Sequence, residues 1–447
     1  PQKTFIGLEN YTKLFADGTF WEAFGHNIYL VIACIIGQIG IAFVLVMMVN
    51  SKLVYCKTIH RTFGFFPSTI SAVCIGLIWN MIYHNKYGIL NWFLTAIGRK
   101  DLCQVWLNNT KIVMLLVTIP LIWQYIGYYI VIILSAIASI STDIFESAEI
   151  DGANGFQKAV YITLPLITPS IMGAMLLTFM FILADFGVSS VLGAPNQIHL
   201  MTTQIYYMIN NSTIANNLQV ASAYSLFLSL FGLVGLWVYN RVLATNKFVV
   251  VSGKSAAVEP TKLNKGPRWI LFAILVIFFL FTTCAPILAT LITSLTKTYG
   301  LPFGPENMTF QNFAQMLQIQ NVARAFKNSL FLSVTSSLVI TIVTMIIAYI
   351  SIRGGVRGVK GVKFMQMTVV LPYAVPGVII ALSMILAFSQ PIAGVRLYNT
   401  IWILLIAYIA RFMNLGYNNI SGAISQVDTS LEEAARISGA SQLRAFK

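Results

Sequence analysis

The stretch FESAEIDGANGFQKAVYITLPL, residues 145–166, is a polar segment in an otherwise apolar chain. A second polar stretch, SLEEAARISGASQLRAFK, covers residues 430–447. Each contains a glutamate, then alanine, and then a glycine six positions after the glutamate. The pairs are Glu146 with Gly152 and Glu433 with Gly439. This repeated spacing predicts that one structural unit occurs twice in the chain.

The composition is typical of a membrane protein. The chain is 57% hydrophobic and 9% charged over 447 residues, whereas soluble globular chains carry about 25% charged residues. Its net charge of +14 is spread through short polar connectors rather than gathered on one face. We therefore expect the lipid bilayer as a partner and no nucleic acid, and we interpret the basic residues as signals of membrane topology.

Several apolar runs are long enough to cross a bilayer, since a spanning helix needs about 20 apolar residues. The sequence therefore predicts an all-α, polytopic membrane helical bundle. The nine runs lie near residues 27–49, 62–83, 112–138, 169–191, 221–243, 269–294, 328–350, 364–388 and 400–420.

The connectors between the runs predict which side of the membrane each one faces. SKLVYCKTIHR (51–61), SIRGGVRGVKGVK (351–363) and the segment 244–268 are rich in Lys and Arg, so the positive-inside rule places them in the cytoplasm. Alternation along the chain then places 139–168 and 421–447 there too. Both polar stretches are thus predicted to face the cytoplasm, with Pro1 outside.

The segment 244–268 contains Gly, Ser, Pro and Lys and has no apolar periodicity. It is typical of a flexible linker. We therefore expect a first domain over 1–243, a cytoplasmic linker over 244–268, and a second domain over 269–447. The outside start predicts that the first helix of the first domain is missing, or else that the protein has its N-terminus outside. The second domain is expected to be truncated in its polar stretch.

Each polar stretch is expected to be a helix that ends at its glycine. Asp143 with Glu146, and Ser430 with Glu433, have the spacing of a capping box at a helix start. The small alanine side chain lets another surface approach the helix closely, and the glycine permits the helix to end at a positive φ. In the first copy a second short helix is expected after Gly152. An ordinary capped loop is the alternative, but two copies in matched positions favour a docking element.

ESAEIDGANGFQKAVYITLP and EEAARISGAS resemble the EAA–G loop of permease subunits in ATP-driven (ABC) importers. Ile162, Leu164 and Pro165 fit the Ile-x-Leu-Pro that follows the glycine in that family, and Ser147 departs from its usual alanine. The resemblance implies two tandem permease domains of the type I ABC importer fold, with about nine of twelve spans present. The residues expected to couple to the ATPase are Glu146, Ala148, Gly152, Glu433, Ala434, Ala435 and Gly439.

The same resemblance implies the partners and the cellular location. Two ATP-binding subunits would bind ATP and Mg²⁺ on the cytoplasmic side, and a substrate-binding protein would deliver substrate from outside. The chain itself is then expected to be no enzyme, to hold no cofactor, and to lie in the inner membrane of a bacterium.

Resemblances to two permease classes point to different substrates. GLENYTKLF and YGILNWFL are similar to sugar-importer permeases. ADFGVSSVLGAP, LPYAVPGVIIALSMILAF and the fused two-domain layout resemble the ferric-iron permease class. We expect ferric iron as the substrate, and a sugar, thiamine, a polyamine or a phosphonate as alternatives.

Other candidate chemistry is weaker. VVVSGKS (249–255) ends like a phosphate-binding loop, but Phe248 stands where that loop needs its first glycine. The four histidines have no metal-ligand spacing, so no metal site is expected. Asp185 is an acid within an apolar run, where it has either a substrate or gating role or an interfacial or helix-packing role.

Two further transporter classes compete with an importer permease. An ion-driven secondary transporter would place ionisable sites in corresponding spans of its repeats, and Asp185 has no counterpart in the second half. A channel would need a repeated selectivity element, which the sequence lacks. The importer permease is therefore the favoured hypothesis.

Overall fold

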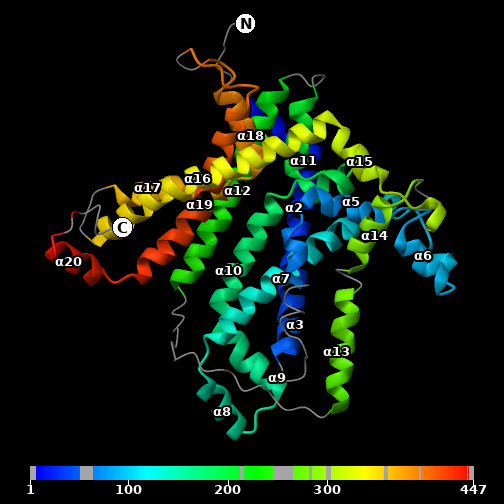
Figure 1. Ribbon diagram of the computed structural model, residues 1–447, viewed down its shortest axis with the longest axis horizontal. Helices are drawn as coiled ribbons and strands as arrows, with labels where there is room; N and C mark the ends of the chain where they lie inside the picture. The colour runs from blue at the N-terminus through cyan, green and yellow to red at the C-terminus, as the bar shows by residue number, and fades with distance from the viewer. Residues whose placement is uncertain are drawn as a thin grey trace. The chain divides into compact units, whose positions relative to one another are not determined.

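The computed structural model consists of helices joined by turns (Figure 1). Within the part of the chain that it describes, the one β-pairing is an isolated bridge between Thr296 and Met308. The described residues are 7–50, 64–211, 216–245, 265–280, 284–298, 304–356, 361–391, 394–439 and 441.

The chain divides into two compact units, Pro1–Ala314 and Gln315–Lys447. Each unit is described by itself. Residues 246–264, most of the expected linker, lie outside the described residues. The expected domain boundaries therefore stay a prediction.

The first unit holds the first copy of the polar stretch and, among its described residues, four candidate membrane spans, Gly18–Met47, Val113–Ala138, Gly155–Leu183 and Asn217–Val242. The polar stretch forms α8 (Thr142–Ile150). The other elements are α1 (Glu9–Ala16), α2 (Gly18–Cys34), η1 (Ile35–Ile39), α3 (Gly40–Asn50), η2 (Phe66–Thr69), α5 (Ala72–Ile82), α6 (Ile89–Ala96), η3 (Lys100–Leu102), η4 (Trp106–Asn108), α7 (Val113–Ala138), α9 (Gly155–Gln157), η5 (Lys158–Thr163), α10 (Leu164–Leu183), η6 (Ser189–Gly193), η7 (Ala194–Asn196), α11 (Met201–Asn210), α12 (Asn217–Thr245), α13 (Lys265–Phe279), α14 (Ala285–Ser294) and η9 (Pro305–Asn307).

α7 is the central helix of the first unit. Its side chains Tyr129, Ile130 and Ile133 are buried against α3 and α10 in one apolar cluster. Pro120 inside α7 has no N–H, so the carbonyl of Leu116 loses its helical partner; the hydroxyl of Tyr83 donates to that carbonyl over 3.2 Å. α8 lies at one end of this unit and α11 at the other (Figure 1).

The second unit holds the second copy, which forms α20 (Thr429–Ile437). α19 packs along α16, and Ala348, Val369 and Tyr417 join them to α17. Pro376 cannot continue a helix, and the chain bends by 111° between α17 and α18. The other elements are α15 (Gln311–Gln318), which crosses the division, α16 (Gln320–Val356), α17 (Val362–Val370), η10 (Leu371–Ala374), α18 (Gly377–Ala387) and α19 (Ile401–Gln426).

Six helices among the described residues are long and apolar enough to cross a membrane, or seven if the bent pair α17–α18 is one span. Of the nine predicted runs, 364–388 corresponds to the bent pair, and two others match none of these helices. Run 62–83 contains the short helix α5. Run 269–294 contains α13 and α14, and residues 281–283 between them lie outside the described part of the chain. The predicted all-α membrane bundle is confirmed.

Candidate functional site

The first polar stretch forms a helix, but the predicted capping box is wrong. Ser141, not Asp143, is the N-cap, and its Oγ accepts the N–H of Asp143 over 3.3 Å. α7 ends at Ala138 with Ser139 as its C-cap, so Ser141, the next short polar side chain, is left to start the new helix. Asp143 then lies in the first turn, where its charge is favourable at the positive end of the helix dipole.

α8 ends in a Schellman motif at Gly152. The N–H of Ala153 donates to the carbonyl of Ala148 over 2.9 Å, and the N–H of Gly152 donates to the backbone carbonyl of Glu149 over 3.1 Å. Gly152 has a φ of +82°, as the αL position of this motif requires. A Cβ at Gly152 would meet nothing within 4 Å. Only the backbone conformation therefore calls for glycine here.

The second helix predicted after Gly152 is present, but it is not a separate short piece. Asn154 and Gln157 form a reciprocal capping box, with both hydrogen bonds at 2.9 Å. α9 then continues through η5 into α10, so that Gly155–Leu183 is one candidate span. An ion pair of 3.0 Å joins Lys158 to Glu149 across the turn. α8 is therefore connected directly to a spanning helix.

The second copy repeats this construction in α20. Asp428 is the N-cap and accepts the N–H of Ser430 over 2.9 Å, so the predicted Ser430 box is also wrong. That hydrogen bond, together with one from the Ser430 side chain, lowers the pKa of Asp428. Gly439 follows the helix with a φ of +90°. The two copies thus share the position of the cap and of the glycine.

An ion pair attaches α20 to the second unit. Nε of Arg353, near the end of α16, lies 2.7 Å from a carboxylate oxygen of Glu432, and both side chains are largely buried. Tyr349 donates its hydroxyl to the other oxygen of Glu432 over 3.2 Å. Arg353 also donates to the carbonyl of Val427 over 2.9 Å. Sequence reasoning missed this contact, because Arg353 had been assigned only to a basic connector.

The predicted coupling residues divide into inward and outward positions. Ala148 is buried against its own unit, so its small size serves packing within the chain. Glu146 and Glu433 are exposed, and the described residues provide no hydrogen bond or ion pair for either. Ala434 is exposed and Ala435 half-buried.

Two exposed isoleucines were not predicted. Ile150 in α8 is 87% exposed and Ile437 in α20 is 88% exposed. Each is the last residue of its helix, two positions before the positive-φ glycine. The signal in the sequence was the Ile shared by both copies four positions after the glutamate.

Asp185 follows α10 and is buried in the first unit. Its carboxylate accepts hydrogen bonds from the N–H of Ser189 at 3.2 Å and from its hydroxyl at 2.6 Å. Thr202 donates its hydroxyl to the Asp185 carbonyl. These contacts are those of a residue that starts the next helical turn, which is the packing role weighed above. A substrate role stays a prediction.

Metal-binding chemistry finds no support among the residues that the structure describes, because no group of three or more His, Cys, Asp and Glu side chains converges there. Two of the histidines that looked scattered in the sequence do lie together, however. Nδ1 of His26 is 3.0 Å from the carbonyl of His199.

Comparison with known proteins identifies similar chains. The chain is 36% identical over 166 residues to the probable ABC transporter permease protein YurN of Bacillus subtilis, covering 37% of this chain and 57% of YurN. It is 33% identical over 208 residues to the probable starch degradation products transport system permease protein AmyD of Thermoanaerobacterium thermosulfurigenes, covering 46% and 70%. It is 30% identical over 248 residues to the multiple sugar-binding transport system permease protein MsmF of Streptococcus mutans, covering 55% and 83%.

The chain therefore spans little more than half the length of YurN. A family model matches residues 40–244 and 354–447, more than half of the chain, and these ranges include both α8 and α20. By this match the chain is a multi-pass membrane protein that belongs to the family of inner membrane components of binding-protein-dependent transport systems.

Proposed function

We propose that the chain forms the substrate pathway of an ATP-driven importer, and that α8 and α20 are the elements through which separate ATP-binding subunits move it. Membership of the binding-protein-dependent transport family supports this role. In this proposal two partner subunits bind ATP and Mg²⁺ in the cytoplasm, and a binding protein delivers substrate at the outer face of the bacterial inner membrane. The chain itself carries out no hydrolysis.

For the substrate we propose a saccharide. AmyD is named for starch degradation products and MsmF for sugar transport, and both align with much of this chain. The relatives do not support ferric iron, which had been expected from LPYAVPGVIIALSMILAF and the fused layout. The sugar alternative, which GLENYTKLF and YGILNWFL favoured, takes its place.

The observation that carries the docking role is the matched exposure of Ile150 and Ile437. A large apolar side chain that is almost fully exposed, at the same place in two copies, is expected to be covered by a partner. The glycine that follows holds each isoleucine at the tip of its helix. An ordinary capped loop would not require the same exposed side chain twice.

The two helices can transmit movement because each is attached to a spanning helix. α8 continues through the turn at Gly152 into α10, and α20 is bound to α16 through Arg353. When ATP draws the two ATPase subunits together, we expect α8 and α20 to be pulled with them. The attached spans then alternate between states open to the cytoplasm and open to the outside.

Transport by the reconstituted complex tests this function. The complete permease would be placed in proteoliposomes with its ATP-binding subunits and binding protein, and uptake of labelled maltotriose, cellobiose, diacetylchitobiose and raffinose would be compared with uptake of ferric iron. We expect ATP-dependent uptake of at least one saccharide and none of iron. Uptake driven by an ion gradient without ATP would favour the secondary transporter instead.

A further inference from the structure

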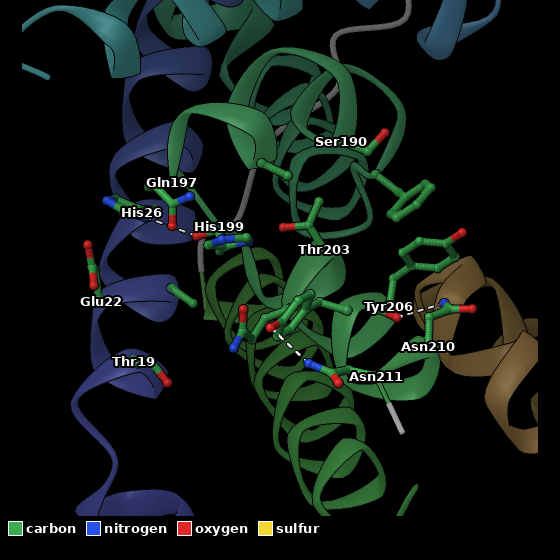
Figure 2. Close-up of a pocket in the computed structure, with 15 residues that line it drawn as sticks. Thr19, Glu22, His26, Ser190, Gln197, His199, Thr203, Tyr206, Asn210 and Asn211 are labelled. Carbon is green, nitrogen blue, oxygen red and sulfur yellow. Dashed lines mark hydrogen bonds between the residues drawn. The ribbon is translucent and has the colours of Figure 1, made fainter. Parts of the chain in front are cut away.

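A polar pocket lies in the first unit beside α11 (Figure 2). α11 lies at the end of this unit opposite α8 (Figure 1). The volume of the pocket is about 850 Å³, within the range of about 300–1,000 Å³ that is typical of small-molecule sites. Its walls are the first turns of α2, the segment around η6 and η7, and α11. The topology prediction places this end of the unit outside the cell.

The walls of the pocket are built by helix periodicity and two hydrogen bonds. Thr19, Glu22 and His26 are three and four residues apart, so they share one face of α2. Oδ1 of Asn27 accepts the first N–H of α11, that of Met201, over 2.8 Å. Nδ1 of His26 contacts the carbonyl of His199 over 3.0 Å. The face of α2 is thereby held against the segment that leads into α11.

The histidine pair offers hydrogen-bonding groups to a ligand. A carbonyl can only accept, so Nδ1 of His26 carries a hydrogen, and Nε2 is the ring nitrogen left for a ligand. Nδ1 of His199 is buried and has no hydrogen-bond partner among the described residues. Burial lowers the pKa of His199. A buried polar atom without a partner beside a cavity indicates a ligand or a water molecule.

The remaining lining residues restrict the charge of the ligand. Among the described residues that line the pocket, Glu22 is the one carboxylate, and none is Lys or Arg. A phosphate or carboxylate ligand would therefore lack a counter-charge. Glu22 is exposed to water, so its charge is screened. A single screened carboxylate would bind a polyamine with several positive charges only weakly. The charge pattern favours a neutral ligand.

The uncharged lining groups fit a polyhydroxylated molecule. Gln197, Gln204 and Asn210 carry side-chain amides, each with donors and an acceptor. Tyr206 stacks at a tilt on Phe186, with ring centroids 5.0 Å apart, and is half exposed. A sugar ring presents C–H groups on its face and hydroxyls around its edge, which match an aromatic surface bordered by amides. An interfacial tyrosine belt would explain Tyr206 but not the amides and the histidine pair around it.

We propose that this pocket is an outer binding site for a neutral saccharide, formed by α2, α11 and the segment between η6 and α11. The proposal rests on saccharide import as the function of the chain. The site lies at the outer end of the bundle, where it would hold a saccharide before the saccharide enters the spans.

Residue-level protection can test the site in the assembled transporter. The probe is whichever of maltotriose, cellobiose, diacetylchitobiose and raffinose drives uptake by the wild-type complex, so failure of all four would overturn the proposed function rather than this site. Diethylpyrocarbonate would label the histidines, and mass spectrometry would follow His26, His199 and, as the reference, His84, which lies outside the pocket. We expect the saccharide to slow labelling of His26 and His199 but not of His84. Equal labelling with and without the saccharide would overturn the site, as would protection by spermidine or phosphate in its place.

Matched variants separate the pocket from general effects on the protein. Tyr206→Ala and Gln204→Leu should each lower the affinity of the pocket for the protecting saccharide about tenfold. This is the factor expected when one good contact is lost. Tyr29→Ala is the control, because Tyr29 is exposed on α2 and does not line the pocket. Glu22→Gln should reduce saccharide affinity less than either pocket variant, with no dependence on salt. If Glu22→Gln abolished binding, the ligand of the pocket would be a cation. If Tyr206→Ala and Gln204→Leu bound the saccharide as well as Tyr29→Ala does, the proposed site would be refuted.

Discussion

The two copies of the repeated unit agree in their elements and differ in how their polar helices are attached. α8 and α20 have nine residues each, α7 and α19 have 26 each, and α5 and α18 have 11 each. Local structure was therefore duplicated closely. The attachment of the polar helix to its unit was not.

α8 is attached through apolar packing, since Ile144 and Phe145 lie against the core cluster around α7. In α20 the residue before the motif glutamate is Glu432 instead of Phe145, and no side chain of α20 is fully buried. Its attachment is the ion pair with Arg353. The same polar helix is thus attached to its unit by two kinds of contact, a hydrophobic one in the first copy and an electrostatic one in the second.

The largest effect is expected from Arg353→Met. Glu432 would remain in a largely buried position without its counter-charge, which costs roughly 3–5 kcal/mol when one partner of a buried pair is removed. We expect fast amide hydrogen exchange across α20 and loss of ATPase coupling, with no change in α8. Hydrogen exchange followed by mass spectrometry measures both helices in one sample.

Two further variants make the Arg353 prediction specific. Arg324→Met changes an exposed arginine on the same helix and should have little effect. The double variant Arg353→Met/Glu432→Met should restore much of the protection of α20, because it replaces the pair with apolar side chains. Normal protection of α20 in Arg353→Met alone would show that the ion pair does not attach the helix.

Ile150→Ser and Ile437→Ser test whether the two tips dock alike. Both side chains are exposed in the isolated chain, so its stability should not change. If a partner covers each isoleucine, the free energy of binding to the ATP-binding subunit should become less favourable by about 1.5–3 kcal/mol per site. Titration of that subunit onto the permease in nanodiscs would measure the loss. Unchanged affinity in both variants would remove the main support for docking.

Gly152→Val and Gly439→Val should each cost about 1–3 kcal/mol, because valine is strained at positive φ. We expect normal membrane insertion and reduced stimulation of ATP hydrolysis by substrate. Gly98→Val is a matched control, since Gly98 also has a positive φ and free space around it but lies in a predicted outer connector. The comparison fails if Gly98→Val uncouples hydrolysis as strongly as the other two.

The smallest expected difference is in the response to acid. The pKa of Asp428 is lowered by the hydrogen bonds that it accepts from Ser430. Its cap therefore stabilises α20 above the unfolded pKa of about 3.9, and this contribution is lost as the pH falls through the lower folded pKa. Ser141, the cap of α8, does not titrate. Hydrogen exchange between pH 6 and pH 3 should show fraying at the start of α20 first, and the Asp428→Ser variant should remove the difference.

The sequence by itself determined the helical membrane class, the two copies of the polar helix and the positive φ of Gly152 and Gly439. These properties depend on short-range physics. Apolar runs of sufficient length must form helices in lipid, because every backbone group has to be satisfied internally. A helix end at positive φ selects glycine through sterics alone.

Only the tertiary structure decided which residues start and hold these helices. The caps are Ser141 and Asp428, because the preceding spans end just before them. Arg353 and Glu432 are 79 positions apart in sequence, and His26 and His199 are 173 apart. Contacts at such separations leave no periodic pattern in the sequence. They depend on how the helices pack, and that packing also determined that Ala148 faces inward while Ile150 remains exposed at the tip of its helix.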